Sequence, residues 1–255
     1  MNKKYVLGNG LSALIFSFYN PSYTIIGMPG ETGGKLTNSF MKSTILLHDT
    51  PESCQFLADL GIEIKKITHT IKYCIGSSVS TEISSVKKLA LIRKKMQNKT
   101  LEVADVDLTL STNDYYISVL SVDWENVISK LKEKVKIIEE RIIRITACEV
   151  VTEVGRYEYE DIVSTLPAQV FWSLYYTPSK LAFRSLPVTF VLAKENPNVL
   201  NGERCNLCYF CDDKYKYTRI NKSGNDFLYE FSGDVSREDA QAALPSQAKI
   251  REYYV

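Results

Sequence analysis

The amino-acid sequence predicts an α/β fold made of two interleaved units. Strand, helix and strand patterns follow one another within residues 5–26, and helices and short strands alternate along the rest of the chain. A length of 255 residues is enough for two lobes. Because no low-complexity linker separates the regions, we expect the second unit to be threaded through the first.

Composition and charge narrow the class of protein. Hydrophobic residues make up 45% of the chain and charged residues 24%, as in globular proteins. The 31 basic residues are balanced by 30 acidic ones, which disfavours a dedicated nucleic-acid-binding protein. Six cysteines are too few for a disulfide-rich secreted domain of this length, and no segment has the roughly 18 apolar residues that span a bilayer. We therefore expect a cytoplasmic protein without a membrane partner.

The N-terminal unit begins with a compact β-α-β pattern. Strands are expected at residues 5–7 and 23–26 around a helix over residues 11–19. A right-handed crossover would make the two strands parallel. Polar residues and glycines interrupt this apolar stretch and no small-x-small cleavage motif follows it, which argues against a secretory signal.

Helices and short strands continue after this unit. Thr50 and Pro51 have the chemistry of an N-cap and a first helical position, so a helix is expected to run from there to Leu60. A basic helix over residues 85–96 and an amphipathic helix over residues 122–135 follow. The remaining patterns predict strands at residues 62–64, 73–75, 137–138, 141–145, 149–154, 157–159, 161–164, 189–192, 207–210, 215–220 and 227–231.

The most informative motif lies between the first strand and the first helix. It is a G-x-G-x-x-A pattern made of Gly8, Asn9, Gly10, Leu11, Ser12 and Ala13. In such a pattern the first glycine permits the tight turn, the second lets a pyrophosphate approach the backbone, and the alanine allows helix and strand to pack closely. The N–H groups at the start of the helix attract the anion. In this context the pattern predicts dinucleotide binding, against the alternative that the glycines only punctuate a loop.

The acidic residue that usually accompanies this motif is missing. The second strand of such a unit normally ends in Asp or Glu, which binds the adenosine ribose. Gly27 occupies that place, and the nearest acid along the chain is Glu31. Either Glu31 or a backbone group replaces the usual acid, or the affinity for the ribose is reduced. An arginine close to this position would indicate a nucleotide with a 2′-phosphate, but the sequence has none there.

The segment after the second strand carries a family resemblance. Its residues are Glu31, Thr32, Gly33, Gly34, Lys35 and Leu36. It resembles the R-x-G-G-R/K segment of flavoproteins of the amine oxidase, protoporphyrinogen oxidase and UDP-galactopyranose mutase superfamily. The resemblance implies that Gly33 and Gly34 let the backbone approach the diphosphate of FAD, and that Lys35 stands where the family often has a basic residue. Glu31 departs from the pattern, since it replaces the first arginine.

A third segment supports the resemblance. Residues 160–167 are similar to the strand by which this family returns from an inserted β-meander to its nucleotide domain. The resemblance implies an FAD/NAD(P)-binding Rossmann-like domain with an inserted β-meander, formed by residues 1–60 and 120–167. It also implies an interleaved α+β substrate domain, formed by residues 61–119 and 168–255. Ile142 would flank the adenine.

The family also has a C-terminal segment in which a glycine opens a helix whose N–H groups reach the flavin. No counterpart is found in this chain, which ends in the strand-like run from Ile250 to Val255. We therefore expect a chain that is short for a flavoprotein, or a cofactor site that is incomplete.

Three cysteines follow a spacing that also occurs in metal sites. Cys205, Cys208 and Cys211 form a C-x2-C-x2-C pattern. In a strand, Cys208 would face away from the other two, so the three could not converge. Buried structural cysteines are the favoured interpretation, no metal is expected, and a metal site is the alternative.

Alternation along residues 214–219 suggests a ligand-binding sheet face. A strand there would place Tyr215, Tyr217 and Arg219 on one side. The resemblance implies an aromatic and basic face opposite the flavin, so Tyr217 and Arg219 are candidate contacts to an anionic substrate. The alternative is a solvated edge strand. The basic run within residues 87–99 is expected to be a solvated helix face, with a nucleic-acid or membrane contact as its alternative.

Together these observations predict an FAD-binding oxidoreductase acting on a small, unidentified substrate. The flavin would carry the redox chemistry while the protein supplies orientation and electrostatics. The sequence assigns no catalytic acid or base and no oligomeric state. The first alternative is a degenerate, non-catalytic nucleotide-binding protein, which the missing acid and the missing C-terminal segment favour. A nucleic-acid-contacting protein is a weaker alternative, because the net charge is only +1.

Overall fold

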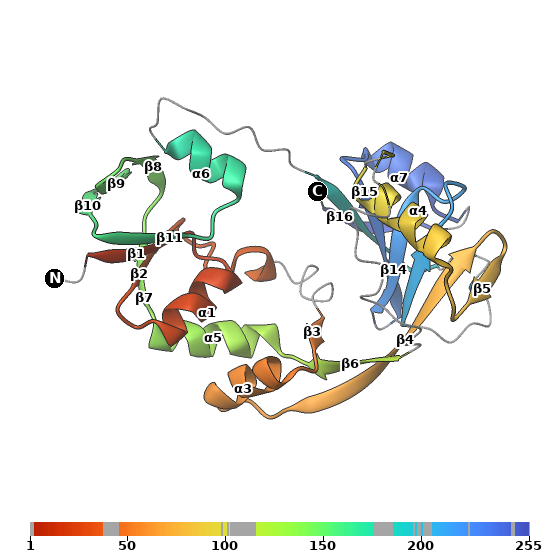
Figure 1. The fold of residues 1–255 in the computed structure, drawn as a ribbon, viewed down its shortest axis with the longest axis horizontal. Helices are drawn as coiled ribbons and strands as arrows, with labels where there is room; N and C mark the ends of the chain where they lie inside the picture. The colour runs from red at the N-terminus through yellow and green to blue at the C-terminus, as the bar shows by residue number, and fades with distance from the viewer. Residues whose placement is uncertain are drawn as a thin grey trace. The chain divides into compact units, whose positions relative to one another are not determined.

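The chain folds into two compact units, each formed by two separate stretches of sequence. The computed structural model describes residues 3–37, 46–97, 99–100, 102, 116–175, 186–195, 197, 200, 206–223, 225–245 and 248–254. Unit 1 comprises residues 1–65 and 121–185, and unit 2 comprises residues 66–120 and 186–255. Both units contain helices and a sheet (Figure 1), so the predicted α/β class is confirmed.

Unit 1 is built on a sheet of four parallel strands in the order β11-β1-β2-β7. The strands are β1 (Lys4–Leu7), β2 (Thr24–Gly27), β7 (Lys136–Glu139) and β11 (Asp161–Ser164). The helix α1 (Leu11–Tyr19) connects β1 to β2, so the predicted parallel β-α-β unit is confirmed. Because the strands are parallel, the segments that follow them emerge at one edge of the sheet.

Two further helices of unit 1 have the start signals and buried faces that their sequences predict. The helix α3 (Pro51–Asp59) begins at Pro51, and the N-cap Thr50 accepts a hydrogen bond from the backbone N–H of Ser53 at 3.2 Å. The helix α5 (Trp124–Lys134) buries one stripe of side chains. That stripe is the predicted one, formed by Trp124, Val127, Ile128 and Leu131.

A three-stranded antiparallel sheet stands between β7 and β11 in the chain. Its strands are β8 (Ile142–Ile145), β9 (Glu149–Thr152) and β10 (Arg156–Glu158). Ile145 and Val150 are buried in one hydrophobic cluster with Leu7, the last residue of β1, and Ile26, the next-to-last residue of β2. The small sheet is therefore anchored beside the carboxyl ends of β1 and β2. The remaining elements of unit 1 are η1 (Gly34–Thr37), β3 (Leu47–His48) and α6 (Ala168–Leu174).

The strand predicted at residues 62–64 is wrong. After α3 the chain passes through Gly61, whose φ is +65°, and the N–H of Ile62 donates to the carbonyl of Leu57 at 2.9 Å. This is the hydrogen bonding of a helix C-cap, and it uses the N–H of Ile62, the first residue that the alternation assigned to a strand. The strand β4 (Lys65–Ile75) begins only at Lys65.

Unit 2 is built on a mixed sheet in the order β16-β12-β15-β14-β13-β4-β6, with β5 beside β4. β13 pairs with β4 in parallel. The neighbouring pairs β16-β12, β12-β15, β15-β14 and β14-β13 are all antiparallel. The helices are α4 (Ser85–Lys95) and α7 (Arg237–Ala243). The other strands are β5 (Ser78–Ser80), β6 (Tyr116–Ser121), β12 (Val188–Ala193), β13 (Leu207–Phe210), β14 (Tyr217–Ser223), β15 (Asp226–Ser232) and β16 (Ile250–Tyr254).

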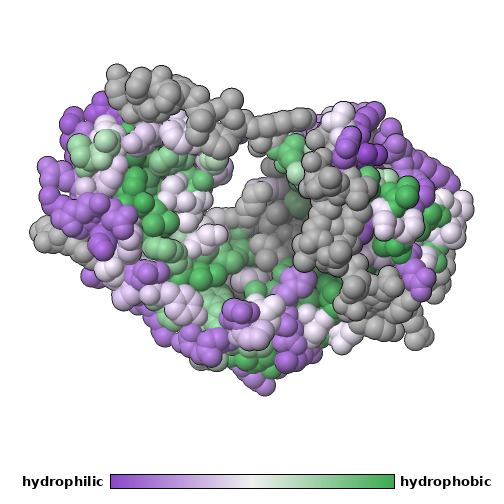
Figure 2. Space-filling model, viewed as in Figure 1, coloured by the Kyte–Doolittle hydropathy of each residue, from purple (hydrophilic) through white to green (hydrophobic). Residues whose placement is uncertain are grey.

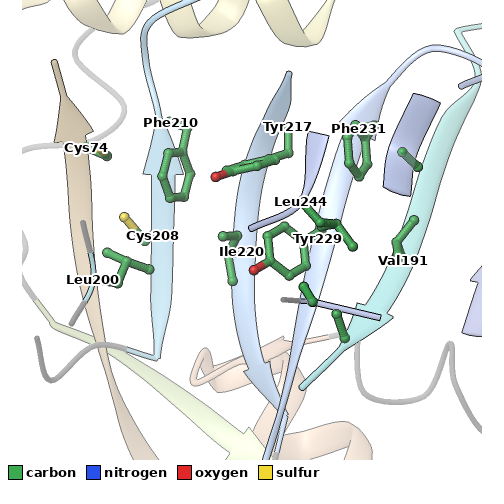
Figure 3. Close-up of a cluster of buried hydrophobic side chains, with 13 residues drawn as sticks. Cys74, Val191, Leu200, Cys208, Phe210, Tyr217, Ile220, Tyr229, Phe231 and Leu244 are labelled. Atoms are coloured by element: carbon green, nitrogen blue, oxygen red, sulfur yellow. The ribbon is translucent and has the colours of Figure 1, made fainter. Parts of the chain in front are cut away.

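An aromatic cluster forms the core of unit 2 (Figure 3). The rings of Phe210 and Tyr217 meet edge to face with centroids 4.7 Å apart, and Tyr217 meets Tyr229 and Phe231 in the same way. All four side chains are almost completely buried. Burial of each such ring stabilises the fold by about 1.5–3 kcal/mol. Leu244 and Ala240 from the α7 region close the cluster.

No helix in the described part of the chain combines the length and the hydropathy that crossing a bilayer requires.

Candidate functional site

A cavity of about 700 Å³ lies at the carboxyl edge of the parallel sheet in unit 1. It is walled by the segments that follow β1, β2, β7 and β11 and by the first turn of α1. Ligands of open α/β sheets bind outside the carboxyl ends of the strands, which is where this cavity lies. Its lining residues are Gly8, Asn9, Gly10, Leu11, Ser12, Gly27, Met28, Glu31, Gly33, Gly34, Arg141, Ile142, Thr165, Leu166, Pro167, Val170 and Leu174.

Backbone hydrogen bonds join the two glycine-rich segments at this cavity. The N–H of Gly8 donates to the carbonyl of Ile26 at 2.8 Å, and the N–H of Gly33 donates to the carbonyl of Asn9 at 2.8 Å. Gly8 has a φ of +95° and Gly33 a φ of +110°, which side-chain-bearing residues rarely adopt. The two segments that the sequence singled out separately, residues 8–13 and 31–36, are therefore brought together.

The start of α1 is open toward the cavity. Gly10 is the N-cap residue, and no side chain among the described residues caps this helix end. The first N–H groups of a helix have no partner within the helix and carry partial positive charge. Leu11 and Ser12 belong to this first turn and line the cavity. The arrangement presents hydrogen-bond donors suited to an anion.

The glycines at the cavity differ in what surrounds them. A Cβ at Gly8 would lie 2.9 Å from Thr165 Oγ1, and one at Gly34 would lie 3.1 Å from Gly10 Cα. At Gly10, by contrast, a Cβ would meet no atom within 4 Å. Its φ of −71° and ψ of 177° are values that any residue adopts. The protein itself thus gives a steric reason for glycine at positions 8 and 34 but none at position 10.

Position 27 is crowded by the loop after β1. A Cβ there would lie 2.6 Å from both Cβ and Cγ of Asn9. The amide of Asn9 is held in place, because its Nδ2 donates to the carbonyl of Met28 at 2.7 Å. Beyond it, the hydroxyl of Thr32 donates to Oε1 of Glu139 at 2.9 Å. The absence of an acid at position 27 therefore has a local packing cause.

Several residues that line the cavity were not candidates from the sequence. Thr165 donates through Oγ1 to the carbonyl of Leu7 at 3.0 Å, so it ties the end of β11 to the end of β1. Pro167 follows, and Val170 and Leu174 from α6 add an apolar wall. The sequence signal was present in residues 160–167, because a segment that ends a parallel strand next to β1 must emerge beside the first glycine loop.

Other predicted residues take supporting positions. Ala13 and Leu36 are buried and do not line the cavity. Ile142, the predicted neighbour of an adenine, lines the cavity at the start of β8, next to Arg141. Lys35 belongs to η1, and its side chain lies outside the described residues.

A second, apolar hollow of about 670 Å³ lies between α1, α3 and the start of α5. Leu11, Ile15, Phe56 and Trp124 contribute to its walls. Figure 2 shows hydrophobic residues reaching the surface in this part of unit 1. Tyr19 and Asp59 also line it, and the hydroxyl of Tyr19 donates to Oδ2 of Asp59 at 2.8 Å. This hollow is separate from the cavity at the carboxyl edge of the sheet and is not part of the candidate site.

In unit 2 the prediction that Tyr217 and Arg219 share a sheet face is wrong. Tyr217 pairs with Phe231 of β15, whereas Arg219 pairs with Glu230, the residue next to Phe231 in the same strand. The register shifts because β14 has a bulge between Tyr217 and Arg219. An extra residue in a strand reverses the side on which the following side chains lie. Tyr217 points into the aromatic core, where burial raises its pKa above the usual value for tyrosine.

Arg219 lies in a compact ionic cluster. Its guanidinium forms an ion pair with Glu230, a side chain that is only 8% exposed. Oε1 of Glu230 also accepts from the hydroxyl of Thr218 at 3.2 Å and pairs with Lys95 at 3.3 Å. The positive charge of Arg219 is therefore largely neutralised inside the unit.

The expected solvated face of the basic helix is also wrong in part. The ammonium group of Lys94 points inward and donates to the carbonyls of Phe210, Asp212, Tyr215 and Tyr217, at 2.7–3.2 Å. Burial lowers the pKa of Lys94 to about 8. Lys87 forms an ion pair with Asp212. These lysines hold the loop between β13 and β14 in place.

The cysteines are placed only in part. Cys208 lies in β13 and is buried in the aromatic core beside Cys74, and Cys211 follows the strand and is also buried. Burial raises the pKa of the Cys211 thiol to about 11. Cys205 lies outside the described residues. Among the residues that are described, no group of three or more His, Cys, Asp or Glu side chains is arranged to hold a metal ion.

Comparison with known proteins shows similarity of structure rather than of sequence. No protein-family model and no curated protein sequence matches the chain. Among solved structures, a reduced UDP-galactopyranose mutase is 12% identical with a TM-score of 0.61, over 99% of this chain and 82% of that one. An oxidoreductase from Methanosarcina mazei is 12% identical with a TM-score of 0.59, over 98% and 87%. A putrescine oxidase variant is 10% identical with a TM-score of 0.58, over 99% and 84%.

These likenesses extend over nearly the whole chain and include two of the three enzyme types named in the sequence resemblance. At 10–12% identity they establish the architecture and leave the chemistry to be argued from the site. The chain therefore has the α/β fold shared by these oxidoreductases and the mutase.

Proposed function

We propose that unit 1 binds FAD in the cavity at the carboxyl edge of its parallel sheet, and that the protein is a flavin-dependent oxidoreductase acting on a small molecule. In this proposal unit 1 is a Rossmann-like dinucleotide domain with an inserted β-meander, and unit 2 is the substrate domain. The likeness to solved oxidoreductases supports this reading of the fold.

The observation that carries the proposal is the open space at Gly10. The backbone there would accept any residue, and a Cβ would touch nothing within 4 Å. The packing of the chain therefore does not require glycine at this position, and the absence of a side chain leaves space for a ligand in the cavity. In the G-x-G-x-x-A pattern this is the residue that a pyrophosphate approaches, which agrees with the uncapped N-terminus of α1 beside it.

The residues at the cavity fit a dinucleotide. The first turn of α1 and the backbone at Gly33 and Gly34 would hold the diphosphate, and Ile142 would pack against the adenine. The apolar wall from α6, including Val170 and Leu174, excludes water from that side of the cavity. When bound, FAD would supply hydride transfer to or from the substrate.

The test compares two glycine variants with the wild type. Gly10→Ala is expected to keep the thermal unfolding midpoint unchanged while weakening the uptake of FAD by about 100-fold, because a methyl group then occupies the place of the diphosphate. Gly8→Ala is expected to lower both the midpoint and the uptake, since its Cβ would collide with Thr165. Visible flavin absorbance and fluorescence titration measure the uptake.

Each outcome decides between the candidate functions. A wild-type protein that is colourless and takes up neither FAD nor ADP overturns the proposal. A protein that takes up ADP but not FAD is the non-catalytic nucleotide-binding protein of the first alternative. Equal uptake by wild type and Gly10→Ala would place the ligand elsewhere.

A further inference from the structure

The dinucleotide cavity has no room for the carboxylate that usually binds ribose. That carboxylate normally comes from the last residue of the second strand, which is Gly27 here. Gly27 has no positive φ, so its backbone would accept a side chain. The obstacle is Asn9: a Cβ at position 27 would lie 2.6 Å from its Cβ and Cγ and 2.9 Å from its backbone N. These atoms lie close to the backbone and cannot move aside cheaply.

Asn9 is fixed by three contacts. Its Nδ2 donates to the carbonyl of Met28 at 2.7 Å and reaches Thr32 Oγ1 at 3.4 Å, and its own carbonyl accepts from the N–H of Gly33 at 2.8 Å. Asn9 as a whole residue is 7% exposed. Asn9 therefore fills the space above Gly27 and ties the first glycine loop to the turn over residues 28–33.

That turn brings another carboxylate to the cavity. Among the described residues that line the cavity, Glu31 carries the only negative charge and Arg141 the only positive one. Glu139 is also near, because it pairs in register with Gly27 across β2 and β7. Glu139 does not line the cavity, and its Oε1 already accepts the hydroxyl proton of Thr32.

We infer that Glu31 accepts the hydrogen bonds of the adenosine ribose hydroxyls, and that Asn9 is the positioning residue that excludes an acid from position 27. The inference rests on the proposed function and adds how the adenosine half is recognised. A carboxylate suits this task because each ribose hydroxyl can donate to one of its two oxygens. The recognition element has thus moved from the end of β2 to the turn that follows it.

The test measures how much the ribose hydroxyls contribute to binding. The probes are ADP and 2′,3′-dideoxy-ADP, titrated calorimetrically against the full chain. Wild type is expected to bind ADP about tenfold or more tightly than the dideoxy compound, since hydrogen bonds to a charged group are strong. In Glu31→Gln this ratio is expected to fall to about threefold or less, because a neutral amide replaces the carboxylate, while the affinity for dideoxy-ADP stays unchanged.

Glu139→Gln is the matched control, since it removes the same charge from the neighbouring strand. It is expected to keep the wild-type ratio. An unchanged ratio in Glu31→Gln, or an equal loss in Glu139→Gln, overturns the assignment of Glu31 while ADP and FAD binding would still support the proposed function. If wild type binds neither ADP nor FAD, both proposals fall.

A second measurement tests the role of Asn9. Gly27→Ala is expected to lower the thermal unfolding midpoint by several degrees in wild type and by clearly less in Asn9→Gly, because the colliding Cβ and Cγ are then absent. Equal losses in the two backgrounds would show that Asn9 does not exclude side chains from position 27. Gly10→Ala, which has open space around its Cβ, is the control that should leave both midpoints unchanged.

Discussion

The polar groups at the cavity of unit 1 and those around β14 in unit 2 are used in opposite ways. At the cavity, the first-turn N–H groups of α1 have no capping side chain among the described residues and face open space. Around β14, Arg219, Lys95 and Thr218 all converge on one carboxylate, Glu230. The cavity therefore has hydrogen-bond donors that a ligand can use. In unit 2, by contrast, these side chains bind one another and stabilise the sheet.

The largest expected effect comes from breaking the ionic cluster of unit 2. Glu230→Gln removes the carboxylate and leaves Arg219 and Lys95 facing each other, so the free energy of unfolding should fall by about 3–5 kcal/mol. Urea unfolding followed by circular dichroism measures the loss. The control is Arg251→Gln, which breaks a more exposed ion pair with Asp226 and should cost about 1 kcal/mol or less. Similar losses in both variants would mean that the cluster is no more structural than a surface pair.

The next effect concerns the buried ammonium group of Lys94. Lys94→Met leaves the four carbonyls that it serves without this donor, so the free energy of unfolding should fall by roughly 2–4 kcal/mol. Hydrogen exchange of residues 210–217 should also become faster. Lys222→Met, on an exposed side chain of β14, is the control and should change little. A loop that keeps its protection in Lys94→Met would contradict the structural role of this lysine.

A third effect, absent at neutral pH, is a loss of stability in alkaline solution. Burial raises the pKa of Tyr217 and Tyr229 in unit 2, and that of Tyr215 to about 12, above the usual value of about 10 for tyrosine. The folded state therefore holds protons that the unfolded state releases above pH 10. Stability contributed by these groups is full below pH 10 and declines as the pH rises further, by up to about 1.4 kcal/mol per pH unit for each group.

This pH dependence can be checked with one substitution. Urea midpoints measured from pH 9 to pH 12 should fall less steeply in Tyr217→Phe, because that variant cannot ionise at this position. Identical slopes in the two proteins would contradict the buried position of the Tyr217 hydroxyl. The variant Gly10→Ala, which changes the cavity of unit 1, should show the same decrease of the urea midpoint with pH as the wild type.

Much of unit 1 could be predicted from the sequence because its signals are local. The caps at Thr50, the apolar stripe of α5 and the turn at Gly8 each depend on residues within a few positions of one another. The wall formed by Thr165 and α6 was missed as part of the cavity, because it joins the site only through the parallel pairing of β1 with β11. The nucleotide and its ribose contact stay predictions.

Unit 2 shows where local reading fails. Strict alternation placed Tyr217 and Arg219 together, and one bulge in β14 separated them onto opposite faces. The sequence of the basic helix does not indicate that Lys94 points inward, since its four carbonyl partners lie in the end of β13, the following loop and the start of β14, more than a hundred residues away. Similarly, Ile62, which alternation assigned to a strand, donates its N–H to the C-cap of α3.

By itself the sequence determined the α/β class, the parallel β-α-β unit and the two glycine segments, because each depends on short-range backbone geometry. Only the tertiary structure decided that these segments share one cavity, that Asn9 occupies the space above Gly27, and that Arg219 is neutralised by Glu230. The physical reason is that side-chain direction and contact depend on strand register, bulges and packing between distant segments. Strand register, bulges and long-range packing cannot be predicted from a pattern of neighbouring residues.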